Sequence, residues 1–578
     1  MHLFHEVHLT FLFIMRWSLK QKPESEVVSR LQSSLQVSPL IATLLAQRGI
    51  STYEEARRFF RPSLGDLHDP YLMKDMDKAV NRIEKAIAQK ERILVFGDYD
   101  VDGTTAVSLM SSYLKTLYPD VDTYIPDRYL EGYGISNKGI DYAEDNEITL
   151  IIALDCGIKS VDKVQYAKEK GIDFVICDHH LPGNEIPDAA AVLDPKRKDC
   201  IYPFKELCGC GVGFKLIQAL GANRGQTTEE LSPYLDLVAT AIAADIVPVV
   251  GENRILAYYG LKVLNSSPRP GILAMMKEFA LADFTITDVV FKIAPRINAA
   301  GRIKHGNYAV RLLTEFNLEE ALDFAKEISE FNQHRKTLDQ QITEEALEQI
   351  VSNQEENRFS SVVYRHDWHK GVIGIVASRL IENYYRPTLV FTKSGDQLAA
   401  SARSVKGFDV YGALEQCQEH IIQFGGHMYA AGLTIKEEAY ETFKNKFESV
   451  VRNSILPEQQ TEEIEIDAVV DFDELDEKTI RILKQFEPHG PENMTPVFLT
   501  PNVFDTGMGQ TMGKNQEHLR LFVKQNHSKG FPAVAFRKGH LLSETRNLKL
   551  MDLVYSVTEN QWKDRVTIQI QIKDLKIN

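Results

Sequence analysis

The stretch Ile93-Leu-Val-Phe-Gly-Asp-Tyr-Asp-Val-Asp-Gly103 decides the fold, because a short apolar run ends in a glycine and three alternate aspartates. Residues 93–96 have the length and composition of a buried strand. Residues 105–117 place their apolar side chains on one face of a helix. The alternation continues with a helix at 161–170 and strands at 150–154, 174–177 and 191–193. This pattern predicts a parallel sheet covered by helices, with its ligand site beyond the carboxyl ends of the strands.

Aspartates follow the carboxyl ends of these strands. If the chain stays extended from Asp98 through Asp100 to Asp102, all three carboxylates point to one side. Asp155 and Asp178 come directly after the next two strands, and Asp245 ends the apolar helical stretch 235–244. We expect these side chains at one edge of the sheet, where a bound cation would relieve their mutual repulsion.

The ligand types indicate which cation is bound. Taken alone, the three alternate aspartates also fit a solvated acidic loop or a calcium loop, but the carboxylates at the other strand ends favour a catalytic metal centre. Oxygen ligands suit Mg²⁺ or Mn²⁺, and the imidazole of His179 shifts the preference towards Mn²⁺. Two cations about 3.5–4 Å apart generate a hydroxide and stabilise an in-line phosphoryl displacement. His180 is then free to donate a hydrogen bond to a phosphate oxygen.

Local basic and glycine-rich segments are candidates for phosphate contact. Residues 289–314 contain five Lys or Arg residues and no acidic residue, around a core APRINAAGR in which Gly301 is expected to be flexible. Arg128 also fits a surface ion pair, and the Gly-Gly-His segment also fits a plain turn. Gly209–Gly213 is interpreted as packing at a helix entry. The candidates are Arg128, Arg296, Asn298, Arg302, Ser401, Arg403, Ser404, Gly425, Gly426 and His427.

The rest of the chain divides by changes of pattern. Helical spacing dominates 256–355, where one helix at about 317–352 would be roughly 50 Å long. A second α/β unit is expected at 356–455, and period-two alternation predicts a small β-barrel or sandwich at 462–578. Residues 86–255 form the expected catalytic domain, preceded by a helical segment at 15–85. Residues 1–14 are expected to be a non-structural extension, with translation starting at Met15.

Composition limits the possible partners and location. The formal charge of −15 means that a polyanion would be bound through metals and local basic patches rather than through the whole surface. Six cysteines without a C-x-x-C pair indicate reduced thiols and a cytoplasmic protein. We find no segment long and apolar enough to cross a membrane, and we expect no membrane partner.

Four motifs resemble, in order, those of the DHH phosphoesterase superfamily: GDYDVDG (97–103), ALDCG (153–157), CDHH (177–180) and AADIVP (243–248). The resemblance implies two Mn²⁺ (or Mg²⁺) ions, with Asp155 as the bridging ligand and His180 in contact with the scissile phosphate. Many members carry a histidine where this chain has Phe96, and Asp98 is the candidate to replace it. The implied ligands are Asp98, Asp100, Asp102, Asp155, Asp178, His179 and Asp245. Asp100, Asp102, Asp155 and His180 form the implied catalytic set.

Further motifs narrow the resemblance. GGHMYAAG (425–432) is similar to the signature of the DHHA1 domain, and APRINAAGR (294–302) and HKGVIGIVASRL (369–380) are similar to RecJ-like exonucleases. The implied architecture is α/β, with a parallel-sheet DHH domain, a long connecting helix, a DHHA1 lobe and an OB-like β domain. Arg128, Ser401 and Arg403 would bind the 5′ phosphate. Arg296 and His427 would hold the phosphate being cut.

The implied activity is 5′→3′ removal of mononucleotides from single-stranded DNA during repair and recombination. A helicase and a single-strand-binding protein are the implied partners. Two alternatives stay open: a DHH phosphodiesterase for short oligoribonucleotides or cyclic dinucleotides, and a non-catalytic DNA-binding scaffold. The long helix and the last β domain favour a polymer substrate over a small one, and the full ligand set argues against the scaffold.

Overall fold

A computed structural model describes residues 15–281, 283–562 and 565–578, so the extension expected at 1–14 lies outside the described residues. The chain divides into two compact units. Among the described residues, the large unit contains 21–332 and 469–578, and the small unit contains 15–20 and 333–468.

The large unit is built around the predicted parallel sheet. Its strand order is β3-β2-β4-β5-β6, and every neighbouring pair is parallel. The strands predicted from apolar runs are therefore confirmed. The bounds are β2 Arg92–Gly97, β3 Val121–Tyr124, β4 Ile148–Leu154, β5 Asp173–Cys177 and β6 Ala191–Leu193.

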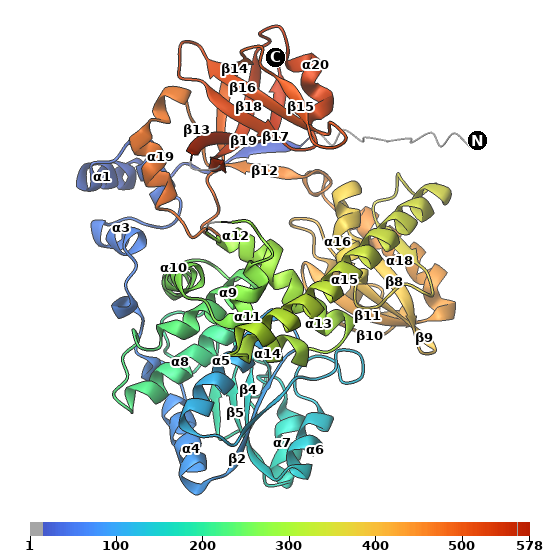
Figure 1. The fold of residues 1–578 in the computed structure, drawn as a ribbon. Helices are drawn as coiled ribbons and strands as arrows, with labels where there is room; N and C mark the ends of the chain where they lie inside the picture. Colours follow the sequence, from blue (N-terminus) through green and yellow to red (C-terminus); the bar gives the residue numbers. More distant parts are fainter. Residues whose placement is uncertain (1–14, 282, 563–564) are drawn as a thin grey trace. The chain divides into compact units, whose positions relative to one another are not determined.

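Helices cover both faces of this sheet (Figure 1). Ile93 and Val95 of β2 face one layer, while Leu94 and Phe96 face the other. Because both faces are covered, the strands are continuously apolar rather than alternating. The first layer contains α4 Met76–Gln89, α5 Val101–Leu117, α8 Gly209–Ala222 and α9 Leu235–Asp245, and the second contains α6 Asn137–Asp145 and α7 Val161–Glu169.

Helices also fill the chain on either side of the sheet domain. The segment 15–85 starts with a strand, β1 Arg16–Leu19, before α1 Ser25–Leu35, α2 Pro39–Ala46, α3 Tyr53–Phe60 and α4. After α9 come α10 Gly251–Ser266, α11 Pro270–Met276, α12 Ile286–Asp288, a π-helical turn at Val289–Ile293, α13 Ala294–Ile303 and α14 Asn307–Thr314. The predicted long helix is α15 Leu318–Ser352, with 35 residues.

The small unit contains a mixed sheet of order β10-β11-β9-β8-β7. Only β7 and β8 pair in parallel, and the other neighbours are antiparallel. A separate parallel pair joins β1 to β12 Glu463–Ile466. The sheet strands are β7 Ser361–Tyr364, β8 Thr388–Ser394, β9 Gln397–Arg403, β10 Ile421–His427 and β11 Ala430–Lys436, with helices α16 Ile373–Asn383, α17 Val410–Glu415 and α18 Tyr440–Ser454.

The last domain is the predicted β domain, preceded by α19 Glu477–Lys484. Its strands run in the order β14-β18-β19-β17-β16-β15, and an additional pairing of β14 with β16 closes the sheet on itself. In β16 the buried Leu519, Leu521 and Val523 alternate with outward residues, as period two requires. The bounds are β14 Phe498–Asp505, β15 Gln510–Met512, β16 His518–Gln525, β17 Phe531–Ala535, β18 Met551–Trp562 and β19 Arg565–Ile577.

Two properties concern the whole described chain. All six cysteines are free thiols and all are buried. Among the described residues, no helix combines the length and the apolar character that crossing a membrane requires.

Candidate metal centre

Carboxylates stand at the carboxyl ends of four strands of the parallel sheet. Asp98 follows β2, Asp155 follows β4, Asp178 follows β5 and Asp194 follows β6, and all four are buried. Asp194 is not among the predicted ligands, although it follows its strand just as the other three aspartates do. Its Oδ1 accepts a hydrogen bond from the amide of Lys196 at 2.7 Å, and burial raises the pKa of Asp194 to about 7.

The expectation that 98–102 stays extended is wrong. Asp100 is the N-cap of α5, where its Oδ1 accepts a hydrogen bond from the Gly103 amide at 3.0 Å. Asp102 lies in the first helical turn. The reason is that a capping carboxylate satisfies an amide that the start of a helix leaves unpaired. Asp102 still joins the cluster, because the first turn of α5 faces the start of α8.

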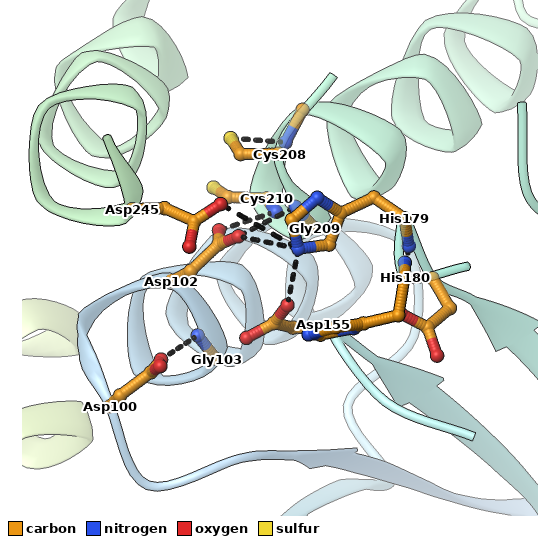
Figure 2. A network of polar contacts seen from close by, with 12 residues as sticks. Asp100, Asp102, Gly103, Asp155, His179, His180, Cys208, Gly209, Cys210 and Asp245 are labelled. Atoms are coloured by element: carbon orange, nitrogen blue, oxygen red, sulfur yellow. Dashed lines mark hydrogen bonds and ion pairs between the residues drawn. The ribbon is translucent and has the colours of Figure 1, made fainter. Parts of the chain in front are cut away.

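The ring of His179 lies between three carboxylates (Figure 2). Its Nε2 is 3.2 Å from Asp155 Oδ1, 3.6 Å from Asp245 Oδ2 and 3.8 Å from Asp102 Oδ2. Two groups of three potential ligands follow, each with its ligand atoms within 4.8 Å of one another. One group is Asp155, His179 and His180, and the other is Asp102, His179 and Asp245.

The N-terminus of α8 holds Asp102 and Asp155 in place. The amides of Gly209 and Cys210 donate to Asp102 at 2.6 and 2.7 Å, where the helix dipole also favours a negative charge. A Cβ at Gly209 would lie 2.5 Å from Asp155 Cβ and 2.7 Å from its Oδ1. The sequence predicts only helix packing for this glycine-rich segment and gives no sign of its contact with two of the predicted ligands.

The electrostatics fit divalent cations. Burial, followed by the charge of Asp100, raises the pKa of Asp102 to about 7, and burial together with Asp102 raises the pKa of Asp245 to about 8. Burial and the nearby His180 lower the pKa of His179 to about 3, so its imidazole is neutral and able to ligate a metal. Asp155 Oδ1 and His179 Nε2 are buried with no hydrogen-bond partner among the described residues. Carboxylates with one imidazole suit Mn²⁺ or Mg²⁺.

Asp178 and His180 form a separate arrangement. Asp178 Oδ1 accepts from the backbone amides of His179 and His180 and lies 2.7 Å from His180 Nδ1, while its Oδ2 accepts from the Ile158 amide at 2.9 Å. Burial opposes ionisation of Asp178, but these hydrogen bonds outweigh it and lower its pKa to about 2. Burial likewise disfavours protonated His180, and the contact with Asp178 outweighs it, so the pKa of His180 is raised.

Tyr133 completes the surroundings of His180. Its hydroxyl lies 3.1 Å from His180 Nε2 and donates to the carbonyl of Asp155 at 3.2 Å. Arg128 is the only residue of this loop among the predicted phosphate-binding residues. Arg128 stacks on the ring of Tyr99 at 4.5 Å, next to Asp98 and Asp100.

Glu131 fixes this loop from inside. It accepts hydrogen bonds from the Asp127 amide and the Tyr124 hydroxyl, both at 2.9 Å, and from the Ser136 hydroxyl. These hydrogen bonds tie together residues on both sides of Arg128 and Tyr133.

The candidates in 289–314 have contacts of their own. Gly301 is not flexible: it is a buried residue of α13, and a Cβ there would lie 2.7 Å from the Tyr99 carbonyl oxygen. Arg296 pairs with Glu278 and stacks on Phe279 at 4.5 Å. Asn298 and Arg302 lie on the same helix as Arg296 and are half-buried.

The remaining candidates belong to the small unit. Ser401 and Arg403 lie on β9, where Arg403 Nη1 donates to Ser401 Oγ at 3.1 Å. Gly374 in the first turn of α16 packs against both, since a Cβ there would be 2.9 Å from Ser401 Oγ and from Arg403 Nη2. The segment Gly425, Gly426 and His427 is not a turn but the exposed end of edge strand β10. Ser404 follows β9, and its hydroxyl donates to the Phe408 carbonyl at 2.7 Å.

Three family models match the chain. They describe the DHH family, N-terminal domain, at residues 92–242, the DHHA1 domain at 357–453, and the RecJ OB domain at 466–574.

The chain is also similar to named proteins over most of its length. The single-stranded-DNA-specific exonuclease RecJ of Bacillus subtilis is 36% identical over 98% of this chain and 71% of its own length. The Escherichia coli protein of the same name is 31% identical over 93% of this chain and 96% of its own. The crystal structure of RecJ from Thermus thermophilus in complex with Mn²⁺ is similar with a TM-score of 0.83 and 26% identity, covering 97% of this chain and 79% of that one.

Proposed function

This chain belongs to the RecJ family of single-stranded-DNA-specific exonucleases, and from that premise we propose how its residues carry out the reaction. It hydrolyses phosphodiester bonds of single-stranded DNA in a metal-dependent reaction. We propose that it starts at the 5′ end and releases 5′-mononucleotides during DNA repair and recombination. The observation that carries the proposal is the cluster of buried, incompletely paired carboxylates around a neutral His179.

The ligands of two Mn²⁺ or Mg²⁺ ions are proposed from this cluster. Asp102, His179 and Asp245 would hold one ion, and Asp155 would be shared with the second. Asp98, Asp100 and Asp178 would add oxygen ligands, and Asp178 would also orient the ring of His180. When bound, such a pair of cations supplies a hydroxide nucleophile and stabilises the charge of an in-line displacement.

His180 is proposed to contact the scissile phosphate. Because Asp178 raises its pKa, the imidazole can carry a proton and donate a hydrogen bond to a phosphate oxygen. Asp178 fixes the ring at Nδ1, so its orientation is set before the substrate arrives, and a phosphate oxygen would replace the Tyr133 hydroxyl as the partner of Nε2. In the reaction the water oxygen bonds to phosphorus while the bond from phosphorus to the 3′ oxygen breaks, and the 3′ oxygen takes up a proton in place of the one that water releases. The phosphate stays on the next nucleotide and becomes the new 5′ end.

Phosphate recognition is proposed for the basic candidates. Arg403 and Ser401 lie beside the N-terminal turn of α16, where backbone amides and the helix dipole favour an anion, and we propose that they bind the 5′ phosphate with Arg128. We propose that Arg296 and His427 hold the phosphate being cut. For Arg296 this requires a phosphate to replace Glu278 as its partner. Asn298, Arg302, Ser404, Gly425 and Gly426 are proposed to line the path of the DNA backbone.

The decisive assay uses 5′-labelled single-stranded and duplex DNA with Mn²⁺, Mg²⁺ or EDTA. We expect mononucleotides from the single strand only, and no release with EDTA or in Asp155→Asn. Asparagine is the suitable replacement because Asp155 has a φ of 59°, a backbone conformation that Asn tolerates. Equal attack on duplex ends would contradict the proposal, and cleavage confined to short oligoribonucleotides or cyclic dinucleotides would replace it with a small-substrate activity.

We further propose a cytoplasmic location and two kinds of protein partner. A single-strand exonuclease needs a reaction that separates duplex strands, so a helicase would supply the substrate and a single-strand-binding protein would keep it open. Co-purification of the full chain with either protein, with and without nuclease treatment, tests this. A direct partner stays bound after the DNA is digested, whereas a protein that only shares the same DNA is lost.

A further inference from the structure

A loop of the C-terminal region packs against the segment that follows Asp245. Asp245 is the last residue of α9, and Ile246 turns the chain with a φ of 60°. The short segment 247–250 then leads into α10. Its Val249 is fully buried and donates its amide to the Pro491 carbonyl at 2.8 Å. Pro491 belongs to residues 485–494, the first part of the connection between α19 and β14, which we call the anchor loop.

Arg254, in the first turn of α10, also binds the anchor loop. The residue is 4% exposed, and its guanidinium donates to four successive carbonyls, those of residues 485–488, at 2.8–3.2 Å. It also donates to the carbonyl of Phe59 and stacks on that ring at 3.9 Å. A buried cation solvated by carbonyls keeps them in place, because any that moves away leaves a donor unpaired.

The anchor loop is itself held together tightly. Asn493 Nδ2 donates to the carbonyls of Phe486 and Pro488 at 2.8 and 2.9 Å, and Arg48 Nε donates to Asn493 Oδ1 at 2.8 Å. Gly490 lies against Val249, and a Cβ at Gly490 would be 2.3 Å from Val249 Cγ2. The two residues are therefore closely packed, and a methyl group added at Gly490 would displace Val249, four residues after Asp245.

We propose that the anchor loop positions Asp245, so that this loop of the C-terminal region sets the affinity of the metal centre. Gly490 and Arg254 act as positioning residues. The inference rests on the proposed metal site of Asp102, His179 and Asp245, which Figure 2 shows converging. Mg²⁺ and Mn²⁺ sites tolerate ligand displacements of only a few tenths of an ångström, so a small shift of the 246–250 segment changes ion affinity.

Two variants of the full chain test this. Gly490→Ala displaces Val249, and Arg254→Met removes the donors that hold residues 485–488. Manganese binding is followed without DNA, by electron paramagnetic resonance of the free ion. We expect the site that contains Asp245 to lose about tenfold in affinity in either variant, so that one of the two binding steps weakens while the other is unchanged. The turnover number should fall at low Mn²⁺ and recover at saturating Mn²⁺, with an unchanged KM for single-stranded DNA.

The control is Gly65→Ala, where the nearest atom to the added Cβ would be Ser63 Oγ at an ordinary 3.5 Å. It should bind Mn²⁺ as the wild type does. A wild-type manganese isotherm in Gly490→Ala would overturn the inference, and so would reduced thermal stability in EDTA without a change in that isotherm. If Arg254→Met does not fold, Gly490→Ala decides alone. Absence of Mn²⁺ binding by the wild type would instead remove the proposed metal centre itself.

Discussion

Replacing Gly209 by alanine should damage the metal centre through a single methyl group. The added Cβ would lie 2.5 Å from Asp155 Cβ and 2.8 Å from its Cα, while ordinary carbon contacts are about 3.5–4.0 Å. Roughly 1 Å therefore has to be gained by moving the start of α8 or Asp155. Neither the backbone nor a Cβ can rotate out of the way. Moving the start of α8 would also withdraw the two amides that hold Asp102.

The expected loss of Mn²⁺ affinity follows from this displacement. Loss of groups that orient metal ligands costs about 10–100-fold in metal affinity, and a misplacement of about 1 Å at a reacting centre costs about 100-fold in rate. We expect the dissociation constant for Mn²⁺ to rise by about 10–100-fold, which is about 1.4–2.7 kcal/mol. The measurement is a manganese titration of the full chain, paired with release of mononucleotides from labelled single-stranded DNA at low and saturating Mn²⁺.

The matched control is Gly211→Ala, two residues further along the same helix. Its Cβ would meet Leu207 Cδ2 at 3.4 Å and Cys208 Sγ at 3.5 Å, which are ordinary contacts. Gly211→Ala should therefore keep wild-type metal binding and rate. If Gly209→Ala folds and binds Mn²⁺ as tightly as the control does, the close packing of α8 against Asp155 is not what shapes the site.

Three further predictions concern other parts of the site. Gly301→Ala should lower Mn²⁺ affinity about tenfold while the protein stays folded. The reason is that the added Cβ would lie 2.7 Å from the carbonyl oxygen of Tyr99, the residue between two predicted ligands in the sequence. An unchanged manganese titration would contradict this. The pKa is about 7 for Asp102 and about 8 for Asp245 in the folded protein, against about 4 for an aspartate in the unfolded chain. The metal-free protein therefore binds more protons when folded than when unfolded. Its free energy of unfolding should fall as the pH rises from about 4 to 8. Mn²⁺ binding at pH 7 should then release protons, and calorimetric heats that do not depend on the ionisation enthalpy of the buffer would rule this out. Arg403→Ala should lose the preference for 5′-phosphorylated over 5′-hydroxyl strands and keep its metal content by elemental analysis, whereas loss of metal would refute the assignment.

The sheet could be predicted because its strands are covered on both faces and therefore appear as continuous apolar runs. The start of α5 could not be predicted from apolar spacing. The helix begins at Val101 rather than near 105, and its first turns carry buried Thr104 and Ser108. Ser108 donates its hydroxyl to the Thr104 carbonyl at 2.7 Å, which makes a polar residue compatible with burial. Such local pairing leaves no sign in a hydrophobic pattern.

The parts of the candidate site that are formed by side chains could be predicted from the sequence, and the parts that are formed by backbone amides could not. Carboxylates after successive strands indicated the cluster that His179 brings together. The backbone amides of Gly209 and Cys210 could not be predicted as partners of Asp102, because every residue except proline has a backbone N–H group. Tyr133 could not be predicted for a different reason. Its role depends on contact with His180, and only the folded loop places its hydroxyl 3.1 Å from His180 Nε2.

The burial of all six cysteines has a practical consequence for labelling chemistry. Thiol reagents need an accessible thiolate, and burial both shields these sulfur atoms and raises the pKa of Cys417 to about 12. A cysteine introduced at an exposed position of either unit would therefore be the preferred site of reaction with a maleimide dye. The native chain can therefore serve as the background for fluorescence experiments, without first replacing cysteines such as Cys156 and Cys177, which are neighbours in the sequence of the predicted metal ligands.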